Sequence, residues 1–443
     1  MSERKRFFSY VIPSVLAFAL SGVYAIVDGF FVGNSVGDSG LSAINIAYPV
    51  VALIQAVGTG FGMGGAVYYS ICRAEKKEGE AREFVAATMW LLLASSAVLT
   101  VVFCLLTEPV LRLLGTGTGE LLSLGKDYLF VISLGTFLQI FGVGLVPLIR
   151  NNGGATFAML TMIAGFITNI VLDWLFVWVY EWSMTGAALA TIIGQGVTMA
   201  GGFGYLIQKG KLSFRIPFRR FSQKAKSITK IGIAPFGLTL TPNISLILIN
   251  RFSASYGGEE AIAVYACISY VISVVYLILQ GVGDGSQPLM SQYYGEREEK
   301  KLRRIRNLAY RFALLLSAAG ILLLFAARWN VGTLFGASEE VTRGVAQVFP
   351  VFLLAIPFIA VNRITTAGFY ATEKTTYAYV LTYAEPAAML VLLFILPAFG
   401  GQMMIWWGTA ISRIFAAVLA VVLKRRADRK GMTVSAAEER QNV

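Results

Sequence analysis

The sequence predicts an all-α integral membrane protein with twelve transmembrane helices, arranged as two parallel-repeat lobes of six helices each. Three observations lead to this prediction. Hydrophobic residues make up 56% of the 443 residues and charged residues only 14%, whereas soluble domains carry about 25% charged residues. Basic residues gather in alternate connections between the apolar segments. The two halves of the chain also resemble each other in sequence.

Apolar segments long enough to cross a bilayer recur along the whole chain, since a spanning helix needs roughly 20 mostly apolar residues. The first of them follows the charged start MSERKR. It is longer than the apolar part of a signal peptide and lacks a small-residue cleavage site, so we expect an uncleaved span. The twelve predicted spans cover residues 10–32, 41–72, 84–106, 126–148, 157–179, 185–208, 229–252, 261–290, 307–327, 345–371, 377–397 and 402–423.

The basic residues predict the orientation of these spans. Of the 37 Lys and Arg residues, 29 lie in the N-terminal segment, in alternate connections and in the C-terminal segment. Cytoplasmic segments carry such an excess, so we expect both termini in the cytoplasm of a multi-pass protein of the cell membrane. The net charge of +12 is then an orientation signal beside anionic membrane lipid, and no nucleic-acid partner is expected.

An internal repeat predicts the division into lobes. Pro13 matches Pro235, the glycine-rich motif at 58–62 matches the one at 281–285, and a charged loop follows each motif. A repeat of six spans, an even number, gives both halves the same orientation. The predicted parts are an amino-terminal lobe at 1–208, a cytoplasmic linker at 209–230, a carboxy-terminal lobe at 231–423 and a cytoplasmic tail at 424–443.

Several kinds of chemistry are excluded by composition. The chain has no histidine, and its three cysteines stand singly in apolar segments, so neither a zinc site nor a disulfide framework is expected. The pattern Gly60-x-Gly62-x-x-Gly65 matches a dinucleotide fingerprint in spacing only, because it lies inside an apolar helix; close helix packing explains it better. We expect no cofactor and no enzymatic activity.

Acidic residues inside predicted spans indicate a functional site. Asp28 follows Tyr24 by one helical turn, and Asp173 follows Asn169 in the same way. A charged side chain at the bilayer centre costs roughly 2.5–3.5 kcal/mol and usually faces a cavity or a partner. The two pairs predict an oxygen-rich pocket that holds a cation, or two carboxyl groups that share a proton. A structural alternative is that each acid only bonds to a neighbouring helix.

The second half carries different buried charges. Asn250 stands where the repeat places Asp28. Asp284 has no cationic neighbour in the sequence, which favours a role facing a cavity. Arg363 and Glu385 either pair with each other or line a substrate site. We therefore expect Asp284, Arg363 and Glu385 as a second polar or substrate site.

At these residues the chain resembles the multidrug and toxic compound extrusion (MATE) family, especially its prokaryotic DinF-like and MepA-like members. The resemblance runs along nearly the whole chain, and it is most specific in IVDGFFVG (26–33), NIVLDWLFVW (169–178), TGAALATIIGQ (185–195) and QPLMSQYYGERE (287–298). It implies a secondary active transporter whose two lobes alternate in access and export organic, often cationic compounds in exchange for protons or sodium.

The resemblance also implies site residues. The positions matching the family's amino-lobe cation-coupling site are Tyr24, Asp28, Asn169, Asp173 and Thr191. Sodium, if it is the coupling ion, would bind at Asp28, Asn169 and Asp173. The expected partners are small organic molecules and membrane lipid, and the protein is expected to work as a monomer. The main alternative is a lipid-linked oligosaccharide flippase of the same superfamily, for which Arg363 and Arg413 would line the cavity.

Overall fold

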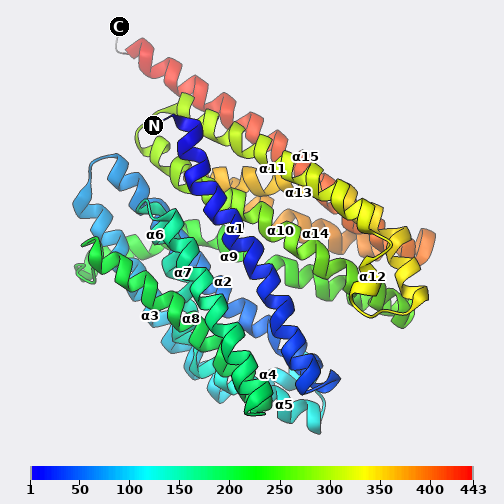
Figure 1. Cartoon of the computed structure of the whole chain (residues 1–443). Helices are drawn as coiled ribbons and strands as arrows, with labels where there is room; N and C mark the ends of the chain where they lie inside the picture. Colours follow the sequence, from blue (N-terminus) through cyan, green and yellow to red (C-terminus); the bar gives the residue numbers. More distant parts are fainter. Residues whose placement is uncertain (1, 442–443) are drawn as a thin grey trace. The chain divides into compact units, whose positions relative to one another are not determined.

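The chain is helical nearly throughout (Figure 1) in a computed structural model that describes residues 2–441. Eleven helices are long and apolar enough to cross a membrane, and the bent pair α5–α6 adds a twelfth span when its two pieces are counted as one. The predicted all-α membrane fold is thereby confirmed. The helices are α1 (Glu3–Ser35), α2 (Asp38–Ala74), α3 (Glu78–Leu105), α4 (Thr107–Leu114), α5 (Glu120–Leu134), α6 (Thr136–Asn151), α7 (Ala155–Asp173), the π-helix η1 (Trp174–Val179), α8 (Ser183–Gln208), α9 (Phe218–Tyr256), α10 (Gly258–Gly295), α11 (Glu299–Ala327), α12 (Val331–Leu334), α13 (Glu339–Ala371), α14 (Thr375–Ile395) and α15 (Pro397–Gln441).

The helices group into two compact units. The first unit comprises Met1–Asn243 and Asp284–Ile305, and the second comprises Ile244–Gly283 and Arg306–Val443. Each of α9, α10 and α11 therefore contributes one end to each unit. The predicted division into lobes separated by a linker at 209–230 remains a prediction.

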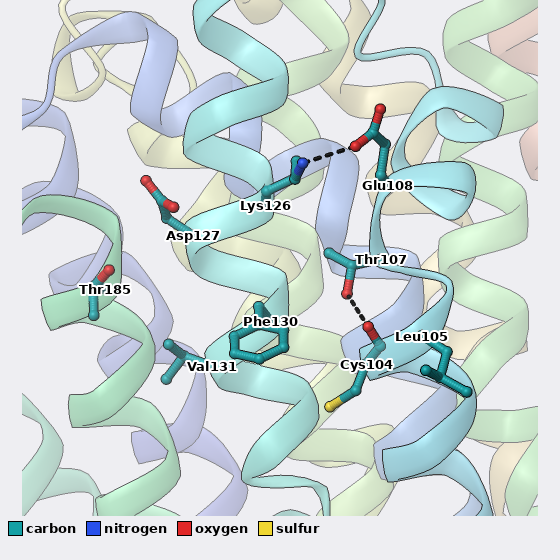
Figure 2. Close-up of a pocket in the computed structure, with 9 residues that line it drawn as sticks. All are labelled: Cys104, Leu105, Thr107, Glu108, Lys126, Asp127, Phe130, Val131 and Thr185. Atoms are coloured by element: carbon teal, nitrogen blue, oxygen red, sulfur yellow. Dashed lines mark hydrogen bonds and ion pairs between the residues drawn. The ribbon is translucent and has the colours of Figure 1, made fainter.

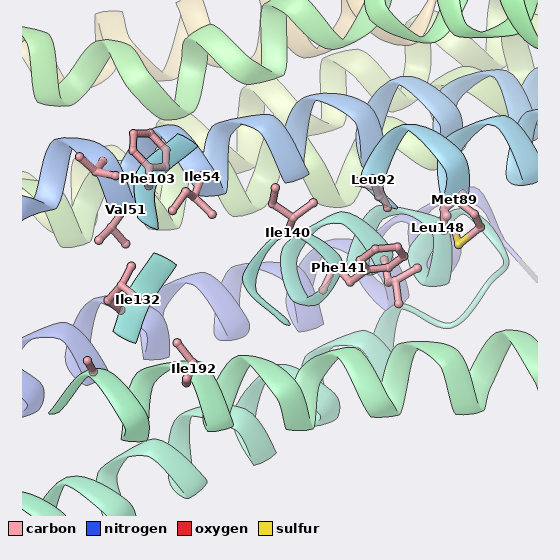
Figure 3. Close-up of a cluster of buried hydrophobic side chains, with 14 of the residues drawn as sticks. Val51, Ile54, Met89, Leu92, Phe103, Ile132, Ile140, Phe141, Leu148 and Ile192 are labelled. Atoms are coloured by element: carbon pink, nitrogen blue, oxygen red, sulfur yellow. The ribbon is translucent and has the colours of Figure 1, made fainter. Parts of the chain in front are cut away.

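The core of the first unit is a cluster of aliphatic and aromatic side chains from α2, α3, α5, α6 and α8 (Figure 3). These side chains are almost completely inaccessible, in contrast to large apolar side chains on the outside of the same helices, such as Leu105 and Leu134, which are more than half exposed. Exposed apolar side chains of this kind are what a lipid-facing surface requires. The cluster includes Val51, Ile54, Met89, Leu92, Phe103, Ile132, Ile140, Phe141, Leu148 and Ile192.

The glycines of α2 allow two neighbouring helices to approach its backbone. A Cβ atom added at Gly58 would lie 2.7 Å from the Ile140 carbonyl oxygen of α6, and one at Gly62 would overlap the backbone of Gly144. A Cβ atom added at Gly60 would lie 3.0 Å from the Gly232 oxygen of α9. Two faces of α2 thus use the small-residue spacing for close packing, as the sequence predicts.

The fourth span is broken between α5 and α6, which meet at an angle of 57°, whereas the sequence predicts one continuous helix at 126–148. The break falls at Gly135, where an added Cβ atom would overlap the Ile192 side chain of α8. A broken helix leaves backbone groups unpaired in an apolar surrounding. The Gln139 side chain satisfies one of them, because its Nε2 donates to the Ile132 carbonyl oxygen at 3.1 Å.

In the second unit, α15 is kinked near its start. Gly400 and Gly401 depart from helical geometry, and Gly401 has a φ of +56°, a conformation that residues with a Cβ atom rarely adopt. Just after the kink, the Gln402 Nε2 donates to the Ser253 hydroxyl of α9 at 2.9 Å. The kink therefore places a side-chain amide where it ties α15 to α9.

Packing at the glycines of α2 generates a test of the fold. We expect Gly62→Leu to lower the stability of the protein by about 1–3 kcal/mol or more, because the new side chain overlaps the α6 backbone. Gly204→Ala in α8 is the matched control, since nothing lies within 4 Å of its added Cβ; it should be neutral or slightly stabilising. The apparent midpoint of thermal unfolding measures both, and equal midpoints for the two variants would contradict this packing.

Candidate functional site

Two acidic side chains from different helices face each other inside the first unit. Asp28 lies near the end of α1, and Asp173 is the last residue of α7. Asp173 is fully buried, and Asp28 is partly buried. Their carboxyl groups lie close enough to interact electrostatically. The structure thus brings together the two acids that the sequence analysis places on separate helices.

The other predicted coupling residues surround this acid pair. Asn169 is 2% exposed and lies one turn before Asp173 on α7. The Tyr24 hydroxyl lies near Thr191 on α8 and within electrostatic range of both acids. The Tyr24 ring stacks on Phe166 of α7, with centroids 5.2 Å apart and an interplanar angle of 8°. Stacking fixes the ring, so the hydroxyl is held beside the acids.

Many polar atoms of this site have no conventional hydrogen-bond partner among the described residues. They are Oδ1 of Asp28, both carboxyl oxygens of Asp173, and both amide atoms of Asn169, and all are shielded from solvent. An unpaired buried polar group costs about 1–3 kcal/mol, and more when it is charged. Two ionised carboxylates can only accept hydrogen bonds, so their approach requires a shared proton or a cation between them.

The donor set suits a proton or a hard cation. Carboxylate, amide and hydroxyl oxygens are the ligands of alkali and alkaline-earth ions, whereas transition metals favour nitrogen and sulfur. In the described part of the chain, no three Asp, Glu or Cys side chains lie close enough to hold a metal ion. A bound cation would therefore take two carboxylates and complete its shell with the Asn169 carbonyl and with hydroxyl groups.

Tyr128 of α5 belongs to this site, and sequence reasoning misses it. Its side chain is 4% exposed, and its hydroxyl lies within electrostatic range of Asp28 and Asp173. A single tyrosine in an apolar helix is usually a core residue, so the sequence carries no signal that separates it from the others. Tyr128 lies on α5, and the break at Gly135 changes the direction of the chain just after this helix. The position of Tyr128 beside the acids is therefore visible only in the fold.

The helix after Asp173 continues as a π-helix, η1, rather than as an α-helix. π-Helical turns are rare and are often found at functional sites. The wider turn frees a backbone carbonyl, and the Ser35 hydroxyl at the end of α1 donates to the Val177 oxygen at 2.9 Å. The two helices that carry the acids are thus joined again beyond the acid pair.

Asp284, expected as part of a second polar site, lies in an ion pair of the first unit. Its Oδ2 is 3.7 Å from Nη1 of Arg150 at the end of α6, and both side chains are about nine-tenths buried. Arg150 also donates to the Ser14 hydroxyl at 3.4 Å and lies 5.5 Å above the Phe18 ring. Sequence reasoning misses Arg150, because it lies beyond the predicted span, where a basic residue is ordinary.

The other two residues of the expected second site, Glu385 and Arg363, lie in the second unit. Oε1 of Glu385 accepts from Nε of Arg413 at 3.4 Å, so a third charged residue contributes to this region. Arg363 lies within electrostatic range of Tyr276, as do Glu385 and Arg413. The structure therefore separates the three expected residues: Asp284 belongs to one compact unit, Arg363 and Glu385 to the other.

A cavity of about 420 Å³ lies apart from the acid pair, between α3, α4, α5 and α8 (Figure 2). Glu108 on its rim accepts from Lys126 at 2.7 Å and from Arg112 at 2.8 Å. Asp127 and Thr185 line the same cavity. The neighbouring Tyr128 on α5 faces the acids instead, so α5 separates an exposed, charged pocket from the buried acid pair.

Comparisons with known proteins place these features in context. Residues 13–175 and 238–392 match the model of the MatE family. The multidrug export protein MepA of Staphylococcus haemolyticus is 23% identical over 421 residues, which span 95% of this chain and 92% of that protein. MepA of Staphylococcus saprophyticus is 24% identical over 422 residues, 94% of this chain and 92% of that protein.

Two solved structures have similar folds. One is a transporter of the MOP superfamily from Pyrococcus furiosus, described by the reverse polarity of its binding pocket; it is 22% identical with a TM-score of 0.89 and covers 96% of each chain. The other is a multidrug resistance transporter of the MATE family in an outward-facing conformation, 22% identical with a TM-score of 0.89, covering 98% of this chain and 97% of the other.

The Glu108 cluster generates a pH prediction. Hydrogen bonds from Lys126 and Arg112, with their charges, hold the pKa of Glu108 below its usual value of 4.5. A lowered folded-state pKa stabilises the protein above the unfolded-state pKa, and this stabilisation is lost as pH falls through the folded-state value. We expect Glu108→Gln to lower the unfolding midpoint at pH 7 and to lose its effect as the pH falls through the lowered pKa of Glu108. In a Lys126→Met, Arg112→Met background the substitution should have little effect at any pH; an undiminished effect there would contradict the ion pairs.

The Arg150–Asp284 pair generates a second prediction. Asp284→Asn leaves the buried guanidinium without this carboxylate, and losing one partner of a buried pair costs about 3–5 kcal/mol. The double variant Arg150→Gln, Asp284→Asn should recover a large part of that loss, because neither charge remains. Unfolding midpoints of these two variants, of the single variant Arg150→Gln and of the unsubstituted protein form a double-mutant cycle. Strictly additive effects would contradict a direct interaction.

Proposed function

The chain belongs to the MatE family of transporters, and on this premise we propose that it is a secondary active multidrug exporter of the cell membrane. It exports organic, often cationic compounds in exchange for protons or sodium ions, and it binds the coupling cation at the acid pair Asp28 and Asp173. Proteins of this family are not enzymes and need no cofactor. The names of the staphylococcal relatives support export of several drugs.

The observation that carries the proposal is the unpaired acid pair itself. Purely structural acids in membrane helices are paired with bases or with backbone groups. Asp284 follows that rule, since Arg150 lies beside it. Asp28 and Asp173 face each other instead, and Asn169 beside them leaves both amide atoms without partners among the described residues. This arrangement is stable only with a proton or cation bound.

Charge repulsion couples cation binding to conformation. Two unit charges 4 Å apart repel by about 4 kcal/mol at an effective dielectric constant of 20. A free energy of that size shifts a two-state equilibrium by roughly three orders of magnitude. Release of the cation therefore favours a state in which α1 and α7 separate their acids, and binding favours the state in which the acids meet. A ligand shifts such an equilibrium only by this difference in affinity.

Partners and topology follow from the same proposal. The coupling site lies within one unit of one chain, which supports function as a monomer. Small organic molecules are the substrates, and lipid contacts the apolar outer surface. Both termini lie on the cytoplasmic side, where the positive charge of the connections is concentrated.

A transport assay tests the coupling site. We expect Asp28→Asn and Asp173→Asn each to reduce the initial rate of ethidium efflux from proteoliposomes at least tenfold, because the site no longer changes charge. Asp127→Asn is the matched control: it removes an acid from α5 that lines the separate pocket, and its rate should stay within twofold. Unchanged efflux in both site variants at equal protein content would exclude the acid pair as the coupling site.

Independently imposed gradients identify the coupling ion. A pH gradient alone drives efflux if the acid pair carries protons, and a sodium gradient alone does so if it binds sodium. The same liposomes serve for both arms, and Tyr128→Phe is expected to slow either reaction without abolishing it. If neither gradient drives efflux of any cationic dye, drug antiport is excluded, and movement of a lipid-linked oligosaccharide becomes the activity to assay.

A further inference from the structure

A second cavity, of about 380 Å³, lies between the start of α3 and the connection from α8 to α9 (residues 209–217), within the first unit. Gly210 opens this connection with a φ of +61°, the left-handed conformation that commonly ends a helix. The cavity is lined by Arg82 of α3 and by Gly210, Leu212, Ser213, Phe214 and Arg215 of the connection. We refer to it as the arginine pocket.

The connection is held against α3, so the arginine pocket is a formed part of the fold. Nε1 of Trp90 on α3 donates to the Phe214 carbonyl oxygen at 3.0 Å. The rings of these two residues also meet edge to face, with centroids 6.2 Å apart. Leu212 and Ile216, on either side of Phe214, pack against the apolar core of the unit. The two arginines of the pocket are therefore carried by segments that are fixed relative to each other.

The acids nearest to the pocket are neutralised by other bases. Glu78, Glu80 and Glu83 stand in the first two turns of α3, and each of them forms an ion pair with a base that does not line the pocket. Their partners are Lys211 at 3.4 Å, Lys224 at 2.7 Å and Arg220 at 2.5 Å, respectively. Arg82 and Arg215 are exposed and form no ion pair with any described residue. The pocket thus carries two positive charges that the described acids leave unneutralised.

The polar groups of the pocket are mainly hydrogen-bond donors. Both guanidinium groups can only donate. The Ser213 hydroxyl and the backbone N–H groups of Ser213, Phe214 and Arg215 also have no hydrogen-bond partner among the described residues. Guanidinium groups, hydroxyl groups and successive backbone N–H groups are the donors that bind phosphate in proteins. The composition of the pocket therefore favours a phosphate group.

An exposed apolar face of α3 begins beside the pocket. Trp90 is 43% exposed, and the exposed side chains that follow it at helical spacing are Ala94, Val98, Val101 and Leu105. Tryptophan is enriched where a membrane helix passes from the apolar core to the headgroups. A soluble phosphate compound would make no use of this face. A phospholipid would use both parts, with its phosphate in the pocket and its acyl chains along α3.

We propose that the arginine pocket is a binding site for an anionic phospholipid. Arg82 and Arg215 donate to the phosphate oxygens, the Ser213 hydroxyl adds a further donor, and the acyl chains lie on the face of α3 that begins at Trp90. The connection is on the side proposed as cytoplasmic, where membranes carry their anionic lipid. The site goes beyond the proposed export function and does not depend on it.

Two lipids with the same acyl chains test the proposal. Phosphatidylglycerol is anionic, whereas the choline of phosphatidylcholine cancels the charge of its phosphate. Binding of each lipid to the purified full-length protein in detergent is measured by native mass spectrometry. The double variant Arg82→Gln, Arg215→Gln should raise the apparent dissociation constant of phosphatidylglycerol at least tenfold, because both charges that face the phosphate are lost. It should change that of phosphatidylcholine by less than twofold.

A matched variant controls for net charge. Arg425→Gln, Arg426→Gln removes two equally exposed arginines from α15, and it should change the binding of phosphatidylglycerol by less than twofold. Because Arg82 and Arg215 are exposed and unpaired, the pocket variant should unfold at the same midpoint as the unsubstituted protein in detergent without added lipid. That midpoint separates loss of the site from loss of the fold.

Each remaining outcome overturns the proposal. Equal losses of phosphatidylglycerol in the two double variants would show that only net charge matters, and an unchanged pocket variant would show that the pocket binds no lipid. Equal losses of both lipids in the pocket variant would remove the preference for an anionic lipid. Glycerol 3-phosphate supplies the phosphate without acyl chains; if it displaces phosphatidylglycerol at equal concentration, the pocket binds a soluble phosphate compound. None of these results depends on dye efflux, so the exporter and the lipid site stand or fall separately.

Discussion

The structure depends on one constraint: in an apolar surrounding, every backbone N–H and C=O group must find its partner within the protein. The spanning segments meet it by forming continuous helices, so each departure from helical geometry is compensated. At Gly135 the Gln139 amide replaces the lost backbone bond, and at η1 the Ser35 hydroxyl takes a freed carbonyl. Both departures adjoin helices of the acid site, α5 and α7. The two irregular backbone segments, at Gly135 and at η1, therefore lie next to the helices that carry the buried polar side chains of the acid site.

Buried side chains are subject to the same constraint, and they divide into two kinds. Arg150 and Asp284 neutralise each other, and the Phe18 ring covers the guanidinium, so this pair serves to hold helices together. Asp28 and Asp173 place like charges together, which costs energy unless a cation is bound. In the proposed exporter, this second arrangement is the coupling site, because a site whose charge changes with occupancy can shift the balance between two conformations. Paired and unpaired charges thus have different roles within one unit.

The internal repeat carries a common frame but two chemistries. Prolines, glycines and charged loops recur in both halves of the sequence. Asp28 of the first half has no acidic counterpart in the second, where Asn250 stands at the matching position. The second unit instead carries an ion pair between Arg413 and Glu385. The two halves therefore share a frame and differ in the charges that they bury.

The sequence by itself determined the membrane fold, the number of spans and the repeat, because hydrophobic length and glycine or proline spacing are local properties of a chain that must cross a bilayer. It also singled out Asp28 and Asp173, since an acid in an apolar helix is conspicuous wherever the helix lies. Only the tertiary structure decided which groups meet. The facing acids, the contribution of Tyr128, the pairing of Asp284 with Arg150 and the approach of Arg413 to Glu385 all join residues from separate helices. Helix rotation, the break at Gly135 and the π-turn after Asp173 set those meetings, and they depend on packing between helices that no local pattern encodes.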